Sequence, residues 1–145
     1  MKETRKHNTG YRLLFGAAAF TGAGGFLFDY NKTHLFNPRW TPHAKFHDAM
    51  TILLGSMLGG AGLYLLQKKS GDQKTQLKWG TMLPAFFWTA QAGSFAFPGA
   101  KGLESEFSDK VPQLGPLRLN EAPMSIFMLS VLALGYTLAK KKAKF

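Results

Sequence analysis

The chain has 145 residues, a formal net charge of +10 and no cysteine. The absence of cysteine excludes disulfides, thiolate metal sites and cysteine nucleophiles. The basic residues lie in short segments beside apolar stretches, with no nucleic-acid-binding motif around them, so we expect no nucleic-acid partner.

Four stretches carry no acidic or basic side chain: residues 13–28, 49–66, 79–97 and 122–139. A helix needs roughly 20 apolar residues to cross the hydrocarbon core of a bilayer, and these stretches approach that length. A surface helix of a soluble protein would carry polar residues every three or four positions, which residues 49–66 lack. We therefore predict an all-α integral membrane protein. It forms a single domain over residues 1–145, with spans at about 11–28, 46–66, 79–97 and 122–139.

The first stretch follows a basic segment and is rich in small residues, which is also typical of a signal peptide. However, the apolar run continues through Phe26, Leu27 and Phe28, beyond the small residues. We therefore expect an uncleaved membrane span.

Small residues recur at helical spacing in the first two predicted spans. Ala18 and Gly22 are four residues apart in the first span, as are Gly55 and Gly59 in the second. This spacing lets helix backbones approach closely. We expect close helix packing at these residues.

Capping residues place two helix starts. Pro42 suits the first turn of a helix and Thr41 suits its N-cap, so the second helix begins well before residue 49. Asn120 is a matching cap for a helix that carries Pro123 in its first turn.

His43 and His47 are four residues apart and share one face of that second helix. Two imidazoles at this spacing can hold a metal ion or relay a proton, or they can hydrogen-bond carbonyls and headgroups at the interface. We expect both to point into the helix bundle beside Asp29, and these three are the candidate catalytic residues. A metal site would need a third ligand. The candidates are His34, Asp29 and Glu106.

Asp29 ends the first span and Asp48 follows the start of the second helix. Because a short connection makes these spans antiparallel neighbours, both carboxylates can face one cleft. Carboxylates at a membrane boundary are costly unless paired, and they are candidates for function. The alternative is that Asp29 pairs with Lys32, and Asp48 with Lys45, at a wet interface.

Further candidate ligand-binding residues lie on the same outer side or, for Gln91, within the third span. The amide of Gln91 needs hydrogen-bond partners, which another helix or a ligand can supply. The candidates are His34, Asn37, Trp40, Asp48, Gln91, Glu106 and Asn120.

The charge is distributed unevenly between the two sides of the predicted membrane. The termini and the 67–78 loop hold twelve cations and two anions, whereas residues 29–48 and 97–121 hold six of each. The positive-inside rule therefore predicts an antiparallel four-helix bundle with both termini in the cytoplasm, in a plasma membrane of bacterial type. The basic segments would contact anionic lipid headgroups.

A family resemblance rests on the segment Asn37-Pro38-Arg39-Trp40-Thr41-Pro42-His43-Ala44-Lys45-Phe46-His47, which follows an apolar span and Asp29. Its Asn-Pro-x-Trp-x-x-His-x-x-Phe-His pattern resembles the signature of a family of small four-span membrane proteins of unknown function. The layout over the whole chain is broadly DoxX-like. The resemblance implies the fold and the membrane location, and it implies no activity.

Two functions fit these features. The first is a small membrane enzyme, or a binding protein for a lipophilic small molecule, with the His and Asp cluster facing outward and Trp40 as a wall. The second is an accessory or structural subunit of a larger membrane complex, and a homo-oligomer also fits. The polar cluster favours the first, and the lack of a specific catalytic motif favours the second. The sequence leaves the substrate, any cofactor and any metal open.

Overall fold

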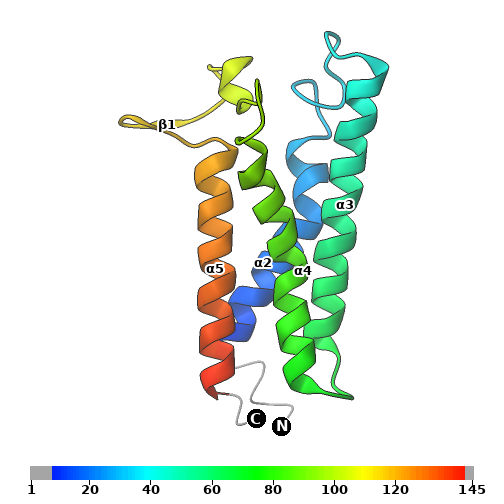
Figure 1. Ribbon diagram of the computed structural model, residues 1–145, viewed down its shortest axis with the longest axis vertical. Coiled ribbons are helices and arrows are strands. Elements are labelled where there is room, and N and C mark those ends of the chain that lie inside the picture. Colours follow the sequence, from blue (N-terminus) through cyan, green and yellow to red (C-terminus); the bar gives the residue numbers. More distant parts are fainter. Residues whose placement is uncertain (1–7, 143–145) are drawn as a thin grey trace.

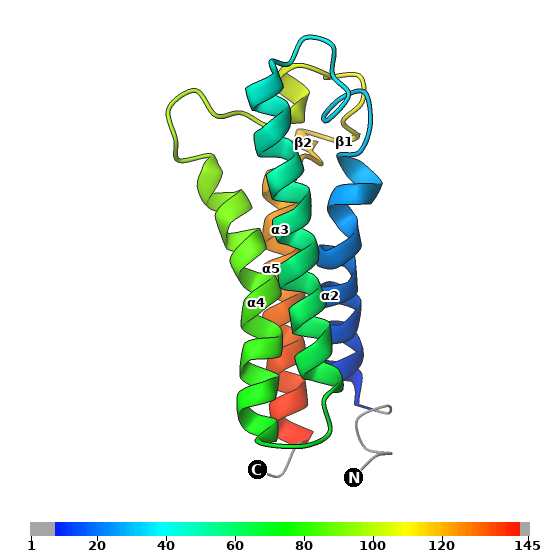
Figure 2. The ribbon, with the colours of Figure 1, turned by 90° about the vertical axis from the view of Figure 1, so that its right-hand side faces the viewer.

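The structure is a computed structural model that describes residues 8–142. Four long helices run side by side (Figure 1). They are α2 (Thr9–Phe28), α3 (Pro42–Gln67), α4 (Gln73–Ser94) and α5 (Glu121–Lys142). α2 begins and α5 ends at the same end of the molecule, where the α3–α4 connection also lies (Figure 2). The opposite end carries residues 29–41 and 95–120, which we call the cap.

The cap contains little regular structure. It holds a single 3-10 turn, η1 (Leu103–Ser105), and two short strands, β1 (Gln113–Leu114) and β2 (Leu117–Arg118). The strands pair antiparallel, with Gln113 opposite Arg118 and Leu114 opposite Leu117. Between them Gly115 has a φ of 58°, a conformation that glycine adopts without steric cost.

Both helix starts predicted from capping residues are confirmed. Pro42 is the first residue of α3, and Thr41 Oγ1 accepts a hydrogen bond from the Ala44 N–H at 3.2 Å. Asn120 Oδ1 accepts one from the Ala122 N–H at 3.0 Å, directly before α5. These caps satisfy N–H groups that have no partner within the helix.

Within the described residues, three helices are long and apolar enough to cross a membrane: Thr9–Phe28, Pro42–Gln67 and Glu121–Lys141. The predicted third span lies on α4, which is not among them. α4 begins with the polar segment 73–78 and ends at Ser94. The predicted span continues to residue 97, but residues 95–99, which include Pro98, form turns. Part of the charge predicted to be cytoplasmic lies outside the described residues, at Lys2, Arg5, Lys6 and Lys144.

α2 packs against α3 and α5, and α4 packs against the same two helices. The α2–α3 contact is very close, because a Cβ added at Gly59 would lie 2.3 Å from the Gly22 nitrogen and 2.6 Å from the Ala18 carbonyl oxygen. The predicted close packing at these residues is confirmed. An equally close approach between α2 and α5, at Gly10 and Ala139, was not predicted.

The outward faces of the helices are apolar as well as the core. Leu14, Leu66 and Leu132 are buried between the helices, whereas Met57 and Phe127 point outward and are 70% and 60% exposed. Exposing so many apolar side chains to water is unfavourable, whereas exposing them to lipid tails is not. The faces of α3 and α5 therefore suit contact with lipid.

We expect Gly59→Ala to destabilise the protein by about 1–3 kcal/mol, because the added methyl group would overlap the backbone of α2. Gly60→Ala is the matched control, since a Cβ at Gly60 meets nothing within 4 Å. The control should be neutral or stabilising by roughly 0.5–1 kcal/mol through helix propensity. Thermal unfolding of the detergent-solubilised variants measures both, and equal melting temperatures would contradict the close contact.

Candidate functional site

A cavity of about 240 Å³ lies beneath the cap, between α2, α4 and α5. Its lining has an apolar part, which comes from the second half of α2, the second half of α4 and the first turn of α5. Its polar part lies where the cap meets the helix ends. The apolar part includes Phe20, Phe28, Phe87, Trp88 and Met124. The polar part includes Asp29, His34, Gln91, Asn120 and Glu121.

The aromatic wall is held rigidly. The rings of Phe20 and Trp88 stack with centroids 6.0 Å apart, and Phe87 meets Trp88 edge-on at 5.3 Å. The Trp88 Nε1–H donates to Thr21 Oγ1 at 2.8 Å, and that hydroxyl donates to the Ala17 carbonyl at 2.8 Å. These bonds join α4 to α2 and fix the orientation of the indole ring.

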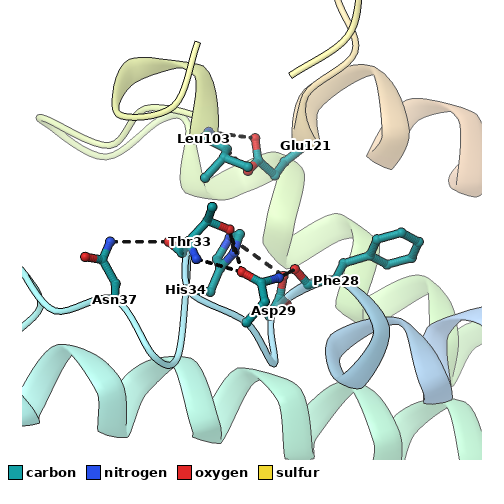
Figure 3. A network of polar contacts seen from close by, with 8 residues as sticks. Phe28, Asp29, Thr33, His34, Asn37, Leu103 and Glu121 are labelled. Carbon is teal, nitrogen blue, oxygen red and sulfur yellow. Dashed lines mark hydrogen bonds and ion pairs between the residues drawn. The ribbon is translucent and has the colours of Figure 1, made fainter. Parts of the chain in front are cut away.

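Asp29 lies directly after α2, at the polar end of the cavity. Its backbone N–H donates to the Gly25 carbonyl at 2.9 Å, and the chain then turns back so that the Leu35 N–H donates to the Asp29 carbonyl at 3.1 Å. This turn brings His34 Nε2 to 3.7 Å from Asp29 Oδ1 (Figure 3). Burial raises the pKa of the Asp29 carboxyl to about 6, and the negative charge of Glu121 adds to the rise.

Glu121 and Gln91 bring α5 and α4 to the same site. Both carboxylate oxygens of Glu121, the first residue of α5, accept from the Leu103 N–H, at 3.1 and 3.2 Å, which ties η1 to the helix (Figure 3). Gln91 also lines the cavity. Nothing in the described part of the chain shows its amide bonded to another helix, so its donors and acceptor are available to a ligand.

A family model matches residues 13–144, nearly the whole chain. The chain belongs to the DUF6640 family, a family of unknown function. Membership agrees with the predicted resemblance to an uncharacterised family, while the signature motif and the DoxX-like layout stay predictions. No curated protein and no solved structure matches the chain. The function of this DUF6640 protein is therefore inferred from its own cavity.

The prediction that His43 and His47 point into the bundle beside Asp29 is wrong. They share one face of α3, with Nε2 atoms 3.1 Å apart, and the Phe46 ring stacks on His43. Both imidazoles are exposed and neither lines the cavity. Over residues 8–142, no three His, Asp or Glu side chains lie close enough together to hold a metal ion, so the pair has no third ligand there.

The rotation of α3 explains this placement. Gly55 and Gly59 face inward, so the positions seven and eleven residues before Gly59, which are Ile52 and Asp48, face the same way. Ile52 is buried and Asp48 is half-buried, whereas His43 and His47 lie on the outward side. The small-residue pattern in the sequence already contained this information.

Three other candidates shape the cap instead of lining the cavity. Asn37 is buried, and its Oδ1 accepts from the Arg39 N–H at 3.0 Å. The Trp40 ring packs edge-on against His34. Glu106 pairs with Arg39 at 3.2 Å and so joins the two segments of the cap. These contacts join parts of the cap to one another.

Asp48 lies just outside the cavity lining, close enough to Asp29 and His34 for their charges to interact. Its Oδ2 atom is buried and has no hydrogen-bond partner in the described part of the chain. The alternative pairs with Lys32 and Lys45 do not occur among the ion pairs of residues 8–142. Within residues 8–142, the carboxylates of Asp29 and Asp48 therefore have no lysine partner.

The aromatic wall was missed by sequence reasoning. Its sequence signal is the spacing of Trp88 and Gln91, which are three residues apart and so share a helix face. Gln91 was recognised as a candidate, and its helical neighbour Trp88 could have been added on this ground.

We expect Asp29→Asn to change how stability depends on pH. The pKa of Asp29 rises from 3.8 to about 6 on folding, so the folded state binds more protons in this window, and stability falls as the pH rises from about 4 to about 6. The variant should lose this fall and should exceed the wild type above about pH 6 by on the order of 1 kcal/mol. Melting temperatures across this range provide the measurement.

The control for this experiment is Asp109→Asn, which changes an exposed carboxylate outside the cavity. It should keep the pH dependence of the wild type. An Asp29→Asn variant with the same slope as the wild type would contradict the burial of this carboxyl.

Proposed function

We propose that this DUF6640 protein is a four-span membrane protein that binds a lipophilic small molecule in the cavity beneath its cap. Three helices are apolar enough to cross a bilayer. α4 packs against two of them, α3 and α5, and this position supports a fourth span in an antiparallel bundle. Its less apolar sequence is tolerable because neighbouring helices shield part of its surface from lipid.

The proposed orientation places the cap outside the cell and both termini in the cytoplasm. The charge difference supports it, because the cap-side segments 29–48 and 97–121 are neutral and the remaining segments carry all of the net charge of +10. The basic side would contact anionic headgroups, at about 1 kcal/mol for each lysine or arginine near the surface. A plasma membrane of bacterial type fits this distribution.

The cavity is the observation that carries the proposal. It combines a rigid aromatic wall with a few polar groups at one end, which is the usual composition of a small-molecule site. Binding is favoured over catalysis because His43 and His47 lie outside the cavity. The titratable groups that remain beside Asp29 are His34 and Glu121.

The second candidate function is an accessory subunit of a membrane complex. It is favoured by the exposed face formed by His43, Phe46 and His47 at the cap end of α3, where Phe46 is 62% exposed. An aromatic ring beside two hydrogen-bonding imidazoles suits contact with another protein at the membrane surface. Replacing Phe46 would then change complex formation and leave the cavity unaffected.

The cavity proposal is tested by filling the cavity. Gly24 lines it, and a Cβ at this position meets nothing within 4 Å, so Gly24→Leu should fold and occupy the space. Gly16→Leu is the matched control, because Gly16 lies on the same helix, also has open space and does not line the cavity. Mass spectrometry of lipophilic compounds retained by the purified proteins should show a loss for Gly24→Leu alone. Equal retention by the two variants would overturn the proposal.

The orientation is tested by cysteine labelling, which is clean because the chain has no cysteine. Ser70 lies in the α3–α4 connection and Ser108 in the cap, and both are exposed. With a membrane-impermeant maleimide on whole cells, Ser108→Cys should label and Ser70→Cys should label only after permeabilisation. Labelling of both from the same side would rule out the proposed topology.

A further inference from the structure

The polar end of the cavity carries more negative than positive charge. Among the described residues that line it, Asp29 and Glu121 supply carboxyls, and only His34 and Lys110 can oppose them. Lys110 is 62% exposed, and its Nζ is already paired with Asp109 at 3.4 Å. Among the described residues that line the cavity, His34 then remains beside Asp29, at 3.7 Å.

Two further carboxyls, those of Glu104 and Asp48, lie next to this end, and each has one buried oxygen without a hydrogen-bond partner in the described residues. Glu104 Oε2 and Glu121 Oε2 would lie 2.4 and 2.7 Å from a Cβ at Gly102, so they face the same small space. Buried carboxylates are costly unless they are paired. Among the described residues, the carboxyls at this end outnumber the groups that can carry a positive charge, which favours a cationic ligand.

We propose that the ligand is a lipophilic amine, whose apolar body lies on the aromatic wall and whose ammonium lies between Asp29 and Glu121. This inference rests on the proposed function. Phe20, Phe28 and Trp88 line the same cavity, and aromatic rings attract cations as well as apolar groups. The volume of about 240 Å³ is below the roughly 300–1,000 Å³ of pockets for drug-sized ligands, which favours one ring on a short chain.

Other headgroups fit the site less well. A carboxylate or phosphate would meet Asp29 and Glu121 as like charges, and a hydroxyl would leave them without a counter-charge. Burial raises the pKa of Asp29 to about 6, and the charge of Glu121 adds to the rise; a bound cation has the opposite effect on a carboxyl. An ammonium would reverse that rise and stabilise the ionised form.

The test compares three ligands that share one apolar body: phenylbutylamine, phenylbutanol and phenylbutyrate. Calorimetric titration of the full-length protein in detergent, at a pH above 7, should show the amine binding at least roughly tenfold tighter than the alcohol, because a hydrogen bond between two charged groups is stronger than one from a neutral hydroxyl. The carboxylate should bind weakest. Gly24→Leu should abolish specific binding of all three, which separates cavity binding from partition into the micelle.

Asp29→Asn tests the role of the carboxyl. In this variant the affinities for the amine and the alcohol should converge, whereas Asp72→Asn, in the α3–α4 connection away from the cavity, should keep the wild-type preference. The preference of the wild-type protein is measured without any variant, so the test does not depend on how well Asp29→Asn folds.

The pH dependence gives a second readout. Protons compete with the ammonium for Asp29, so amine affinity should fall below about pH 6, approaching tenfold per pH unit, while alcohol affinity stays level. The groups facing Asp29 are His34 and Glu121, with Asp48 beside them, and Lys110 lies at the same cavity. Protonation of His34 would weaken amine binding in the same direction. If the affinity of Asp29→Asn for the amine no longer falls below about pH 6, the pH dependence of the wild type is due to Asp29. If its affinity still falls, that assignment is overturned.

The remaining outcomes separate this inference from the proposed function. If phenylbutanol or phenylbutyrate binds as tightly as the amine and Gly24→Leu abolishes that binding, the amine inference is overturned and the lipophilic-ligand site stands. If no probe binds in a manner sensitive to Gly24→Leu, both are overturned.

Discussion

The close contact between α2 and α3 sets the rotation of both helices. Gly59 lies against Gly22 and Ala18 with no room for a side chain, and Ser56 Oγ donates to the Gly22 carbonyl at 2.8 Å in the same place. Once this contact forms, the inward face of α3 is fixed along its whole length, because a helix is stiff. The contact therefore directs Asp48 towards Asp29, and it directs His43 and His47 away from the cavity.

The cavity exists because α2 is bonded to α4 in its middle but carries two glycines nearer the cap. In its middle, Thr21 binds the Trp88 indole and the helices are tightly joined. Beyond that point Gly24 and Gly25 follow, and Gly24 leaves open space where a larger side chain would reach. The aromatic rings of α2 and α4 then line this space without filling it. Residues of the cap line its outer end, and Glu121, which binds Leu103, ties this part of the cap to α5.

The sequence predicted local features well and long-range features poorly. The helix starts at Pro42 and Glu121 follow from short-range capping chemistry, and the close packing at Gly22 and Gly59 follows from helical spacing. The pairing of Arg39 with Glu106 joins residues 67 positions apart in the chain, and no local rule selects that partner. The wrong prediction for His43 and His47 has a different origin: their chemistry suits a site, but their angle around the helix from Gly55 and Gly59 points them away from the bundle.

The charges at the cap end are separated in a way that a purely structural cover would not need. Residues 29–48 and 97–121 contain equal numbers of acidic and basic side chains, yet the acidic ones are half-buried more often than the basic ones. Glu106 and Asp109 are exposed and pair with Arg39 and Lys110, and Lys45 is the one half-buried base of these two segments. Among the acidic residues, Asp29, Asp48, Glu104 and Glu121 are half-buried. The exposed basic residues are Lys32, Arg39, Lys101, Lys110 and Arg118. Mixing the two would neutralise the buried carboxyls at little cost, because charged pairs at this boundary are readily formed. An arrangement that lowers stability is usually retained where function requires it, and here Asp29 and Glu121 line a cavity whose walls suit an apolar ligand.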